Sequence, residues 1–167
     1  MDLLTAIDTR SSAARLTQPG PTPQHLARIL EAAGRAPDHG RMKPWHLAVL
    51  DEPARQRFAA AAAQAKRRRM PTMSEEQLAA EREKMLRSPT IVVVGCAVRE
   101  NPKVPEIEQI IAAGAAAQNL FLAAHDLGYG VMWKTGAAAY DPDVKSVVGL
   151  RAADHIVAIM HLGTRLK

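Results

Sequence analysis

Residues 91–98 read I-V-V-V-G-C-A-V, an unbroken apolar stretch that follows Pro89 and is rich in β-branched side chains. A strand with one face in water would alternate apolar and polar residues, whereas this stretch has no charged side chain on either face. We therefore expect residues 91–98 to form a central strand that is covered on both sides.

Helices and shorter strands are expected on both sides of this central strand. Apolar residues at helical spacing and capping residues such as Thr22 and Ser74 indicate the helices, and short apolar runs that follow turn residues indicate the strands. The expected helices cover residues 3–8, 23–35, 51–69, 74–86, 106–127 and 141–148, and the further strands cover residues 45–50, 131–133 and 156–162. No repeat or linker divides the sequence. We therefore expect one α+β domain over residues 1–167, with a mixed β-sheet flanked by helices.

The expected helix over residues 106–127 is apolar on nearly every face, and residues 112–117 contain only alanine and glycine. Such a helix is normally buried all round. A domain of 167 residues has little interior for a helix of this length, so a second subunit is expected to cover one side, which predicts a homodimer. The apolar stretch, residues 110–124, is shorter than the roughly 20 residues that a membrane span needs, so we expect no membrane partner.

Charge and cysteine content restrict the partners and the compartment. The net charge of +5 and the pI near 9.7 favour nucleic-acid binding, especially at the run Lys66 to Arg69. That run has no interleaved aromatic residue and lies just before Pro71, so we prefer cations at a helix C-terminus as its explanation. Cys96 is the single cysteine, which excludes a disulfide framework, and residues 1–10 lack the apolar core of a secretory signal. We therefore expect a cytoplasmic protein that binds no nucleic acid.

Several common kinds of site are excluded by the sequence. The expected central strand is followed by R-E-N-P at residues 99–102, so the glycine-rich dinucleotide fingerprint is absent, as are the phosphate-binding P-loop and the G-x-S-x-G motif. The six histidines show no metal-ligand spacing, and His125 and His161 lie in apolar segments that favour a structural role. We therefore assign no metal ligand and no catalytic side chain.

Three separate segments combine cations, hydroxyl groups and turn residues. They read R-S-S at residues 10–12, R-A-P-D-H-G-R-M-K-P-W at residues 35–45, and W-K-T-G at residues 133–136. The second segment leaves a helix and enters a strand, so a rigid scaffold can aim Arg35, His39 and Lys43 at an anionic, planar ligand. Plain structural interpretations remain open: Arg10 and Arg35 as surface ion pairs, and Trp133 as a core residue.

Taken together and in this order, the three segments resemble the nitroreductase family of FMN-dependent oxidoreductases. In that family an N-terminal R-[RH]-S element is followed by an A-P-[SD] loop that leads to Q-P-W, and then by a late G-x-x-W segment. The resemblance is to the compact YdjA-like subgroup and extends from Leu4 to Lys167. It implies the nitroreductase-like fold, a homodimer with FMN sites at the subunit interface, and NAD(P)H as hydride donor.

The resemblance also implies which residues hold the cofactors. The FMN contacts match Arg10, Ser11, Ser12, Arg35, His39, Lys43, Trp133, Lys134 and Thr135, and the nicotinamide contacts match Ala123, Ala124, His125, Asp126, Leu127 and Gly128. Residues 10–12 are expected to hold the ribityl phosphate through charge-assisted hydrogen bonds. Residues 133–135 are expected to reach the flavin of the partner subunit.

Two positions depart from the family pattern. Ser11 stands where the subgroup has a second arginine, which weakens the expected phosphate site by one cation. Lys43 stands where a glutamine usually precedes Pro-Trp. A lysine beside the ring would stabilise negative charge at the N1 and C2 carbonyl edge of reduced flavin. Alternatively, Lys43 points to solvent, and the altered loop indicates a changed substrate or a weaker flavin site.

The implied reaction passes hydride from NAD(P)H through FMN to a nitroaromatic, quinone or similar small-molecule acceptor in a ping-pong cycle. The cofactor carries this chemistry and the protein supplies placement and electrostatics, so no protein acid or base is needed. Three alternatives remain open. The first is a family member with another output, such as dehalogenation, flavin degradation or dehydrogenation, for which residues 65–86 are the candidate lid. The others are a flavin-binding protein without robust turnover and a basic nucleic-acid-binding module.

Overall fold

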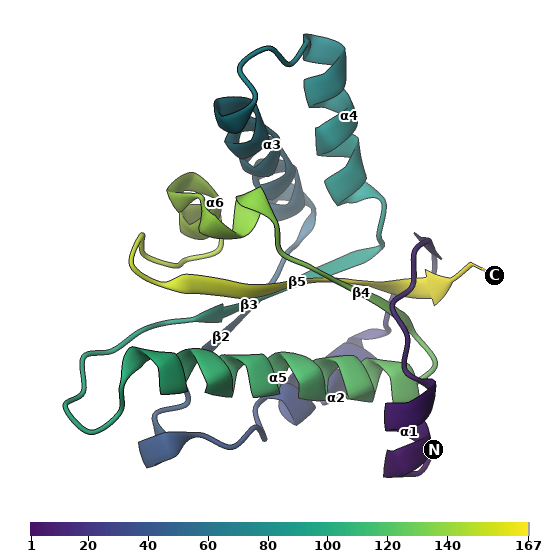
Figure 1. The fold of residues 1–167 in the computed structure, drawn as a ribbon. Coiled ribbons are helices and arrows are strands. Elements are labelled where there is room, and N and C mark those ends of the chain that lie inside the picture. Colours follow the sequence, from purple (N-terminus) through teal and green to yellow (C-terminus); the bar gives the residue numbers. More distant parts are fainter. Residues whose placement is uncertain (167) are drawn as a thin grey trace.

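One β-sheet separates two groups of helices in the computed structural model, which describes residues 1–166 (Figure 1). The strands are β1 (Leu16–Thr17), β2 (Trp45–Val49), β3 (Thr90–Cys96), β4 (Gly130–Lys134) and β5 (His155–Arg165). The helices are α1 (Leu3–Thr9), α2 (Pro23–Ala33), α3 (Glu52–Arg69), α4 (Glu75–Leu86), α5 (Glu106–Asp126) and α6 (Pro142–Val147), with short 3-10 turns at His39–Arg41 and Ala137–Tyr140. The sequence predicted the six helices and four of the strands, and it missed β1 and the two short turns.

Strands β3 and β5 form the centre of the sheet. β3 pairs with β2 on one side and with β5 on the other, and β5 also pairs with β4 and β1. Each of these pairings is antiparallel, so the α+β class is confirmed, whereas the expected mixture of strand directions is not found in residues 1–166. Continuous apolar strands are typical of parallel sheets, but helices on both faces give an antiparallel strand the same burial.

Alternate residues of β3 enter two separate hydrophobic cores. Val92 and Val94 pack with residues of α2 and α5, whereas Ile91 and Val93 pack with residues of α3 and α6. All four side chains are fully buried, and burying each is worth about 1.5–3 kcal/mol. Figure 1 shows the same arrangement, with α2 and α5 below the sheet and α3, α4 and α6 above it. The expected central strand, covered on both faces, is confirmed.

Helix α5 buries only one of its faces in a single chain. Ala113, Ala116 and Leu120 are fully buried against the sheet, whereas Ile107 is 60% exposed and Ile111 is 64% exposed on the outer face. Within residues 1–166 the outer side of Ile107 and Ile111 is thus open, which agrees with the expectation that one domain covers only part of this helix. Its cover by a second subunit stays a prediction. By length and hydropathy α5 is a candidate membrane span, but its inner face packs on the sheet as a core helix does.

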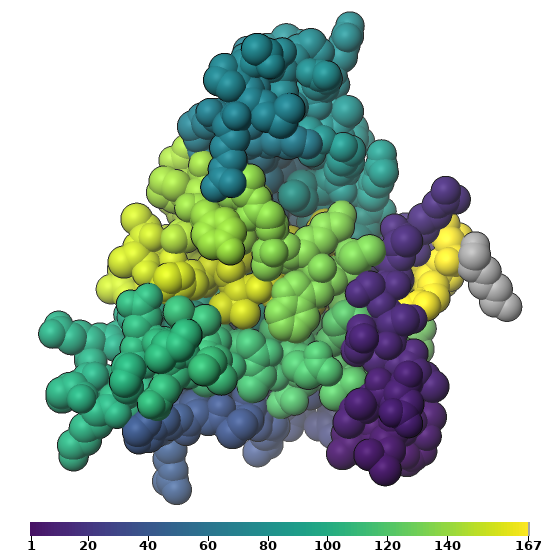
Figure 2. Space-filling model, in the orientation of Figure 1, coloured from purple at the N-terminus to yellow at the C-terminus, as the bar shows by residue number. Residues whose placement is uncertain are grey.

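The basic run at the end of α3 is used within the fold. Helices α3 and α4 form a hairpin that projects from the sheet, which Figure 2 shows at the top of the molecule. Three of the cations reach acidic residues of neighbouring helices, in the pairs Lys66–Glu81 (2.7 Å), Arg67–Glu75 (2.6 Å) and Arg68–Asp141 (2.5 Å). The run thus stabilises contacts of α3 with α4 and α6, which supports its interpretation as a helix end.

Candidate functional site

The N-terminal segment at residues 10–12 lies beside the end of β5. Arg10 ends α1, and its guanidinium lies 4.9 Å from the centre of the Phe121 ring on α5. Arg165, at the end of β5, donates a hydrogen bond to the Ser11 hydroxyl (2.9 Å) and another to the Ser11 carbonyl. A guanidinium therefore stands beside Ser11, the position at which the family pattern has an arginine. No local pattern predicts this contact, because 154 residues separate the two partners.

A cavity of about 160 Å³, which we call the cationic cavity, opens next to this segment. Ala13 and Ala14 form its wall on the N-terminal side, and the C-terminal part of α4 and strands β4 and β5 complete it. Its polar lining consists of Lys84, Arg87, Ser88, Lys134 and His161. Of the residues predicted for the flavin site, Lys134 lines this cavity directly, and residues 10–12 immediately precede its alanine wall.

The charges of the cationic cavity are only partly compensated. Lys84 forms an ion pair with Glu81 (2.5 Å), which in turn also pairs with Lys66. Burial, followed by the positive charges of Arg87 and Lys84, lowers the pKa of Lys134. An anionic group in the cavity would relieve this repulsion, so the cavity suits a negatively charged ligand.

His161 is a buried histidine in the lining of the cavity. Its Nδ1 lies 2.8 Å from the Ser88 hydroxyl, and its Nε2 is buried and has no hydrogen-bond partner in the described part of the chain. Burial, followed by the charges of Lys134 and Arg55, lowers the pKa of His161 from 6.5 to about 4. The imidazole is therefore neutral at pH 7. The expectation of a structural histidine with both ring nitrogens hydrogen-bonded holds for Nδ1 and fails for Nε2.

The loop over residues 35–45 lies at a different part of α5. Nδ1 of His39 is 2.6 Å from the carboxylate of Glu108, near the start of this helix, whereas Arg10 contacts Phe121. The 13 positions between Glu108 and Phe121 correspond to roughly 20 Å along a helix. Within one chain, therefore, His39 and Arg10 lie too far apart to belong to one binding site.

Lys43 and Arg35 both lie on the surface of this loop region. Lys43 has a φ of 47°, a left-handed conformation that is costly for a residue other than glycine, and its N–H donates to the Asp38 carboxylate (2.8 Å). Arg35 is 78% exposed and pairs with Glu31 (3.3 Å), which agrees with the surface ion pair left open above. Arg35 and Lys43 are thus exposed, whereas Ala36 and Pro44 of the same loop are buried.

Residues 133–135 point in different directions. Trp133 packs against the α2 and α5 side of the core, and its Nε1 donates to the carbonyl of Val157 (3.3 Å). Lys134 lies on the opposite face, in the cationic cavity, and Thr135 follows the strand as an exposed residue. The core interpretation of Trp133 therefore agrees with the structure, and Lys134 is the member of this group that can contact a ligand in the cavity.

The segment expected to contact the nicotinamide, residues 123–128, lies under α1. Ala124 is fully buried, Nε2 of His125 is 2.9 Å from the Thr9 hydroxyl, and Asp126 pairs with the N-terminal amine (2.6 Å). These side chains make contacts within the fold, and their role toward NAD(P)H stays a prediction.

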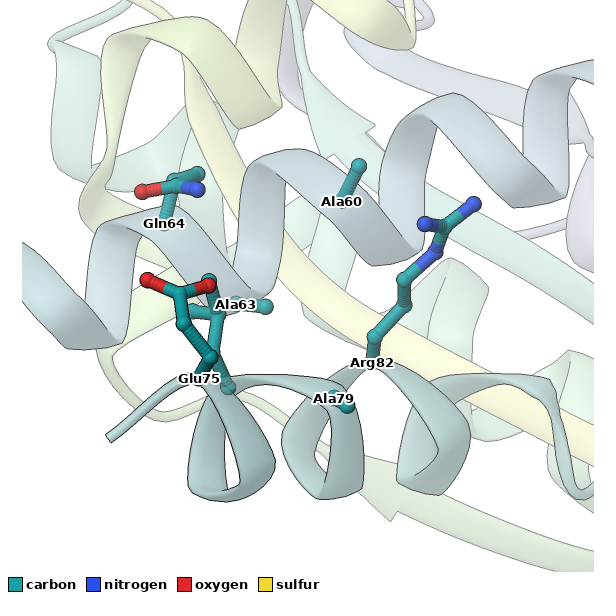
Figure 3. A pocket seen from close by; sticks show the side chains of 7 residues that line it. Ala60, Ala63, Gln64, Glu75, Ala79 and Arg82 are labelled. Atoms are coloured by element: carbon teal, nitrogen blue, oxygen red, sulfur yellow. The ribbon is translucent and has the colours of Figure 1, made fainter. Parts of the chain in front are cut away.

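A second hollow, between α3 and α4, has a volume of about 220 Å³ (Figure 3). Three of its seven lining residues are alanine, and its two charged side chains have partners elsewhere: Glu75 pairs with Arg67, and Arg82 donates to Gln56. This hollow is a gap between two packed helices without a group of converging donors. The cationic cavity is therefore the better candidate site.

Comparison with known proteins gives one consistent result. The family model described as "Nitroreductase family" matches residues 7–164. The chain is 38% identical over 165 residues to "Putative NAD(P)H nitroreductase YdjA" of Escherichia coli, covering 98% of this chain and 88% of the relative. It is 33% identical over 174 residues to a "Putative NAD(P)H nitroreductase" of Haemophilus influenzae, covering 100% of this chain and 90% of the relative.

Solved structures share the fold. A nitroreductase-like family protein from Bacillus cereus superimposes with a TM-score of 0.82 at 26% identity, covering 100% of this chain and 87% of the other. A nitroreductase with bound FMN from Bacteroides fragilis superimposes with a TM-score of 0.75 at 22% identity, covering 99% and 89%. The described architecture is thus that of nitroreductase-like folds.

Proposed function

Because the chain belongs to the nitroreductase family and is therefore an oxidoreductase, we propose that it binds FMN and passes hydride from NAD(P)H to a nitroaromatic, quinone or similar acceptor. The observation that carries this proposal is the cationic cavity. Lys134 lines it together with Ala13 and Ala14, which directly follow residues 10–12. Lys134, from one segment of the family pattern, thus lies near the residues that directly follow another segment, although more than 100 residues separate the two in sequence.

The residues around the cavity fit the polar groups of FMN. Arg10 and Ser12 precede the alanine wall in sequence, and Arg165 contacts Ser11 between them. We assign these cations and this hydroxyl to the phosphate, for which guanidinium groups are suited by their charge and fixed donor geometry. Lys84 and Lys134 supply donors for the carbonyl edge of the ring and positive charge near it. Arg165 thus supplies a positive charge beside Ser11, where the family pattern has an arginine.

We further propose that two chains share each site. The cationic cavity, at about 160 Å³, is smaller than the roughly 300–1,000 Å³ typical of ligand pockets, so one chain can enclose only part of FMN. The exposed Ile111 on α5 lies beside the loop that carries His39. Together with the exposed Ile107 it suits contact with a second copy. We assign residues 35–45, instead of residues 133–135, to the site of the partner, because Lys134 shares a cavity with Ala14 of its own chain.

The chain's own residues bind and orient, and we assign none of them an acid or base role. When bound, FMN supplies a ring nitrogen that accepts hydride from the nicotinamide and later gives it to the acceptor. The sequence has no dinucleotide fingerprint of its own, so donor and acceptor would use the same open position in turn, which predicts ping-pong kinetics. The basic nucleic-acid module is disfavoured, because Lys66, Arg67 and Arg68 are engaged in ion pairs.

Reconstitution with FMN followed by anaerobic reduction tests the enzyme proposal. The protein is expected to take up FMN with a flavin absorption spectrum, and NADH or NADPH is expected to bleach that spectrum without oxygen. Failure to retain any FMN would contradict the proposed site. Bound FMN that neither donor reduces would instead indicate a flavin-binding protein without turnover.

Sedimentation tests the shared site. The protein is expected to sediment as a dimer of the 18.1 kDa chain at micromolar concentration. A monomer that still binds FMN at full occupancy would show that one chain completes the site.

A further inference from the structure

We propose that His161 recognises the flavin ring by accepting, at Nε2, a hydrogen bond from the ring N3–H. This inference rests on the proposed function, namely that the cationic cavity holds FMN. It starts from Nε2 of His161, a buried nitrogen that has no hydrogen-bond partner within residues 1–166, in a side chain that lines this cavity. A buried nitrogen of this kind carries an uncompensated desolvation cost, which a ligand with a suitable donor would remove.

The hydrogen bonds of Ser88 accommodate a proton on Nδ1 of His161. The Ser88 hydroxyl has a single hydrogen, and its oxygen lies 3.3 Å from the carbonyl of Thr90, which can only accept. When the hydroxyl donates to this carbonyl, Nδ1 of His161 must donate to the hydroxyl oxygen, 2.8 Å away. A neutral imidazole has one N–H, so Nε2 is then left with a lone pair.

The surrounding charge favours the same arrangement. Lys134 and Arg55 act on the ring of His161 with positive charge, and Lys84 and Arg87 line the same cavity. Positive charge disfavours an N–H dipole that points into the cavity and stabilises a lone pair there. The neutral His161 therefore offers a hydrogen-bond acceptor in a cavity whose charged side chains are all donors.

This pattern is complementary to one edge of the flavin ring. The pyrimidine edge presents the C2 carbonyl, the N3–H and the C4 carbonyl, which is an acceptor, a donor and an acceptor. Lysine and arginine side chains have no acceptor atom, so they can serve the two carbonyls but not the N3–H. Four side chains in the cavity lining carry nitrogen: Lys84, Arg87, Lys134 and His161. Of these, His161 supplies the acceptor that the N3–H of the flavin requires.

Two flexible side chains lie next to His161 in the lining of the cavity. Met132 is the cross-strand partner of His161 and lines the same cavity, as does Lys134. Both side chains are unbranched, and methionine in particular adapts readily to a new neighbour. A ligand that enters the cavity can therefore displace these side chains without a change in the backbone.

Binding of two flavins tests the proposal. Dissociation constants for FMN and for 3-methyl-FMN, which lacks the N3–H, are measured by fluorescence titration of the wild-type protein, His161→Phe and His46→Phe. The His46 variant is the matched control, because His46 bonds the carbonyl of Val148 outside the cavity. The wild-type protein and this control should prefer FMN by about tenfold, whereas His161→Phe should bind both flavins alike.

Each outcome has a defined meaning. Equal affinity of the wild-type protein for both flavins, or a preference that persists in His161→Phe, would overturn the role of His161 while leaving FMN binding intact. Absence of binding by the wild-type protein would overturn the proposed function and this inference together.

Nitrogen-15 NMR of the wild-type histidines provides a second measurement that does not depend on the folding of a variant. Nε2 of His161 should be unprotonated in the free protein, and its signal should shift with FMN but not with 3-methyl-FMN. A protonated Nε2 in the free protein would contradict the proposal.

Discussion

Replacing Asp154 by asparagine should destabilise the protein at neutral pH. The Asp154 carboxylate is buried and accepts hydrogen bonds from the N–H of Val98 (3.0 Å), from the N–H of Arg151 (2.7 Å) and from the Arg151 guanidinium (2.7 Å). The bonds from Arg151 outweigh burial and lower the pKa of Asp154 from 3.8 to about 2. A carboxyl with a lowered pKa contributes stability above its unfolded pKa, and this shift corresponds to about 2 kcal/mol at pH 7.

Urea denaturation at pH 7 and at pH 3 measures the effect. The loss in Asp154→Asn should be about 2 kcal/mol at pH 7 and about half of that at pH 3, because the wild-type contribution disappears as the pH falls through the folded pKa. The control Asp8→Asn, on the exposed side of α1, should change stability by less than about 0.5 kcal/mol. A loss in Asp154→Asn that is equal at both pH values, or below about 1 kcal/mol at pH 7, would refute the reasoning.

Three further predictions concern the candidate site and the core. Arg10→Ala should weaken FMN binding about 5- to 30-fold, because a hydrogen bond to phosphate is worth about 1–2 kcal/mol, and unchanged affinity in a fluorescence titration would count against this role. Lys43→Gln should shift the reduction potential of bound flavin if the cation faces the ring; an unchanged potential in an anaerobic titration would assign Lys43 to solvent. Burial, followed by the charges of Asp154 and Glu106, raises the pKa of Cys96 to about 11, so a thiol reagent at pH 8 should label it only after unfolding. Rapid labelling of the folded protein would contradict its burial.

The sequence predicted those parts of the fold that depend on neighbours in the chain. The caps at Thr22 and Ser74 form as expected, because each hydroxyl accepts from an N–H three residues later. The apolar run of β3 is buried on both faces as predicted. The two-residue strand β1 carries no such pattern, since it exists only through its pairing with the end of β5.

The candidate site was less accessible to sequence reasoning, because its groups come from distant parts of the chain. Arg165 reaches Ser11, and Ser88 reaches His161 across 73 residues, so no local spacing signals either pair. The family resemblance selected Lys134 but could not show that Trp133 faces the other side of the sheet. That assignment needed the packing of Trp133 against the α2 and α5 side of the core and the position of Lys134 in the cavity.

The candidate site takes its residues from two parts of the backbone that we expect to differ in protection against hydrogen exchange. Helix α1, which leads to Arg10, buries only Ala6, whereas β5 holds His161 in the centre of the sheet. Elements with few buried contacts open locally, but central strands exchange their amide hydrogens mainly through global unfolding. We therefore expect fast hydrogen exchange in residues 3–12 and slow exchange around His161 in the free protein. A ligand that spans both parts would slow exchange in the N-terminal segment most, so part of its binding energy would be used to order that segment.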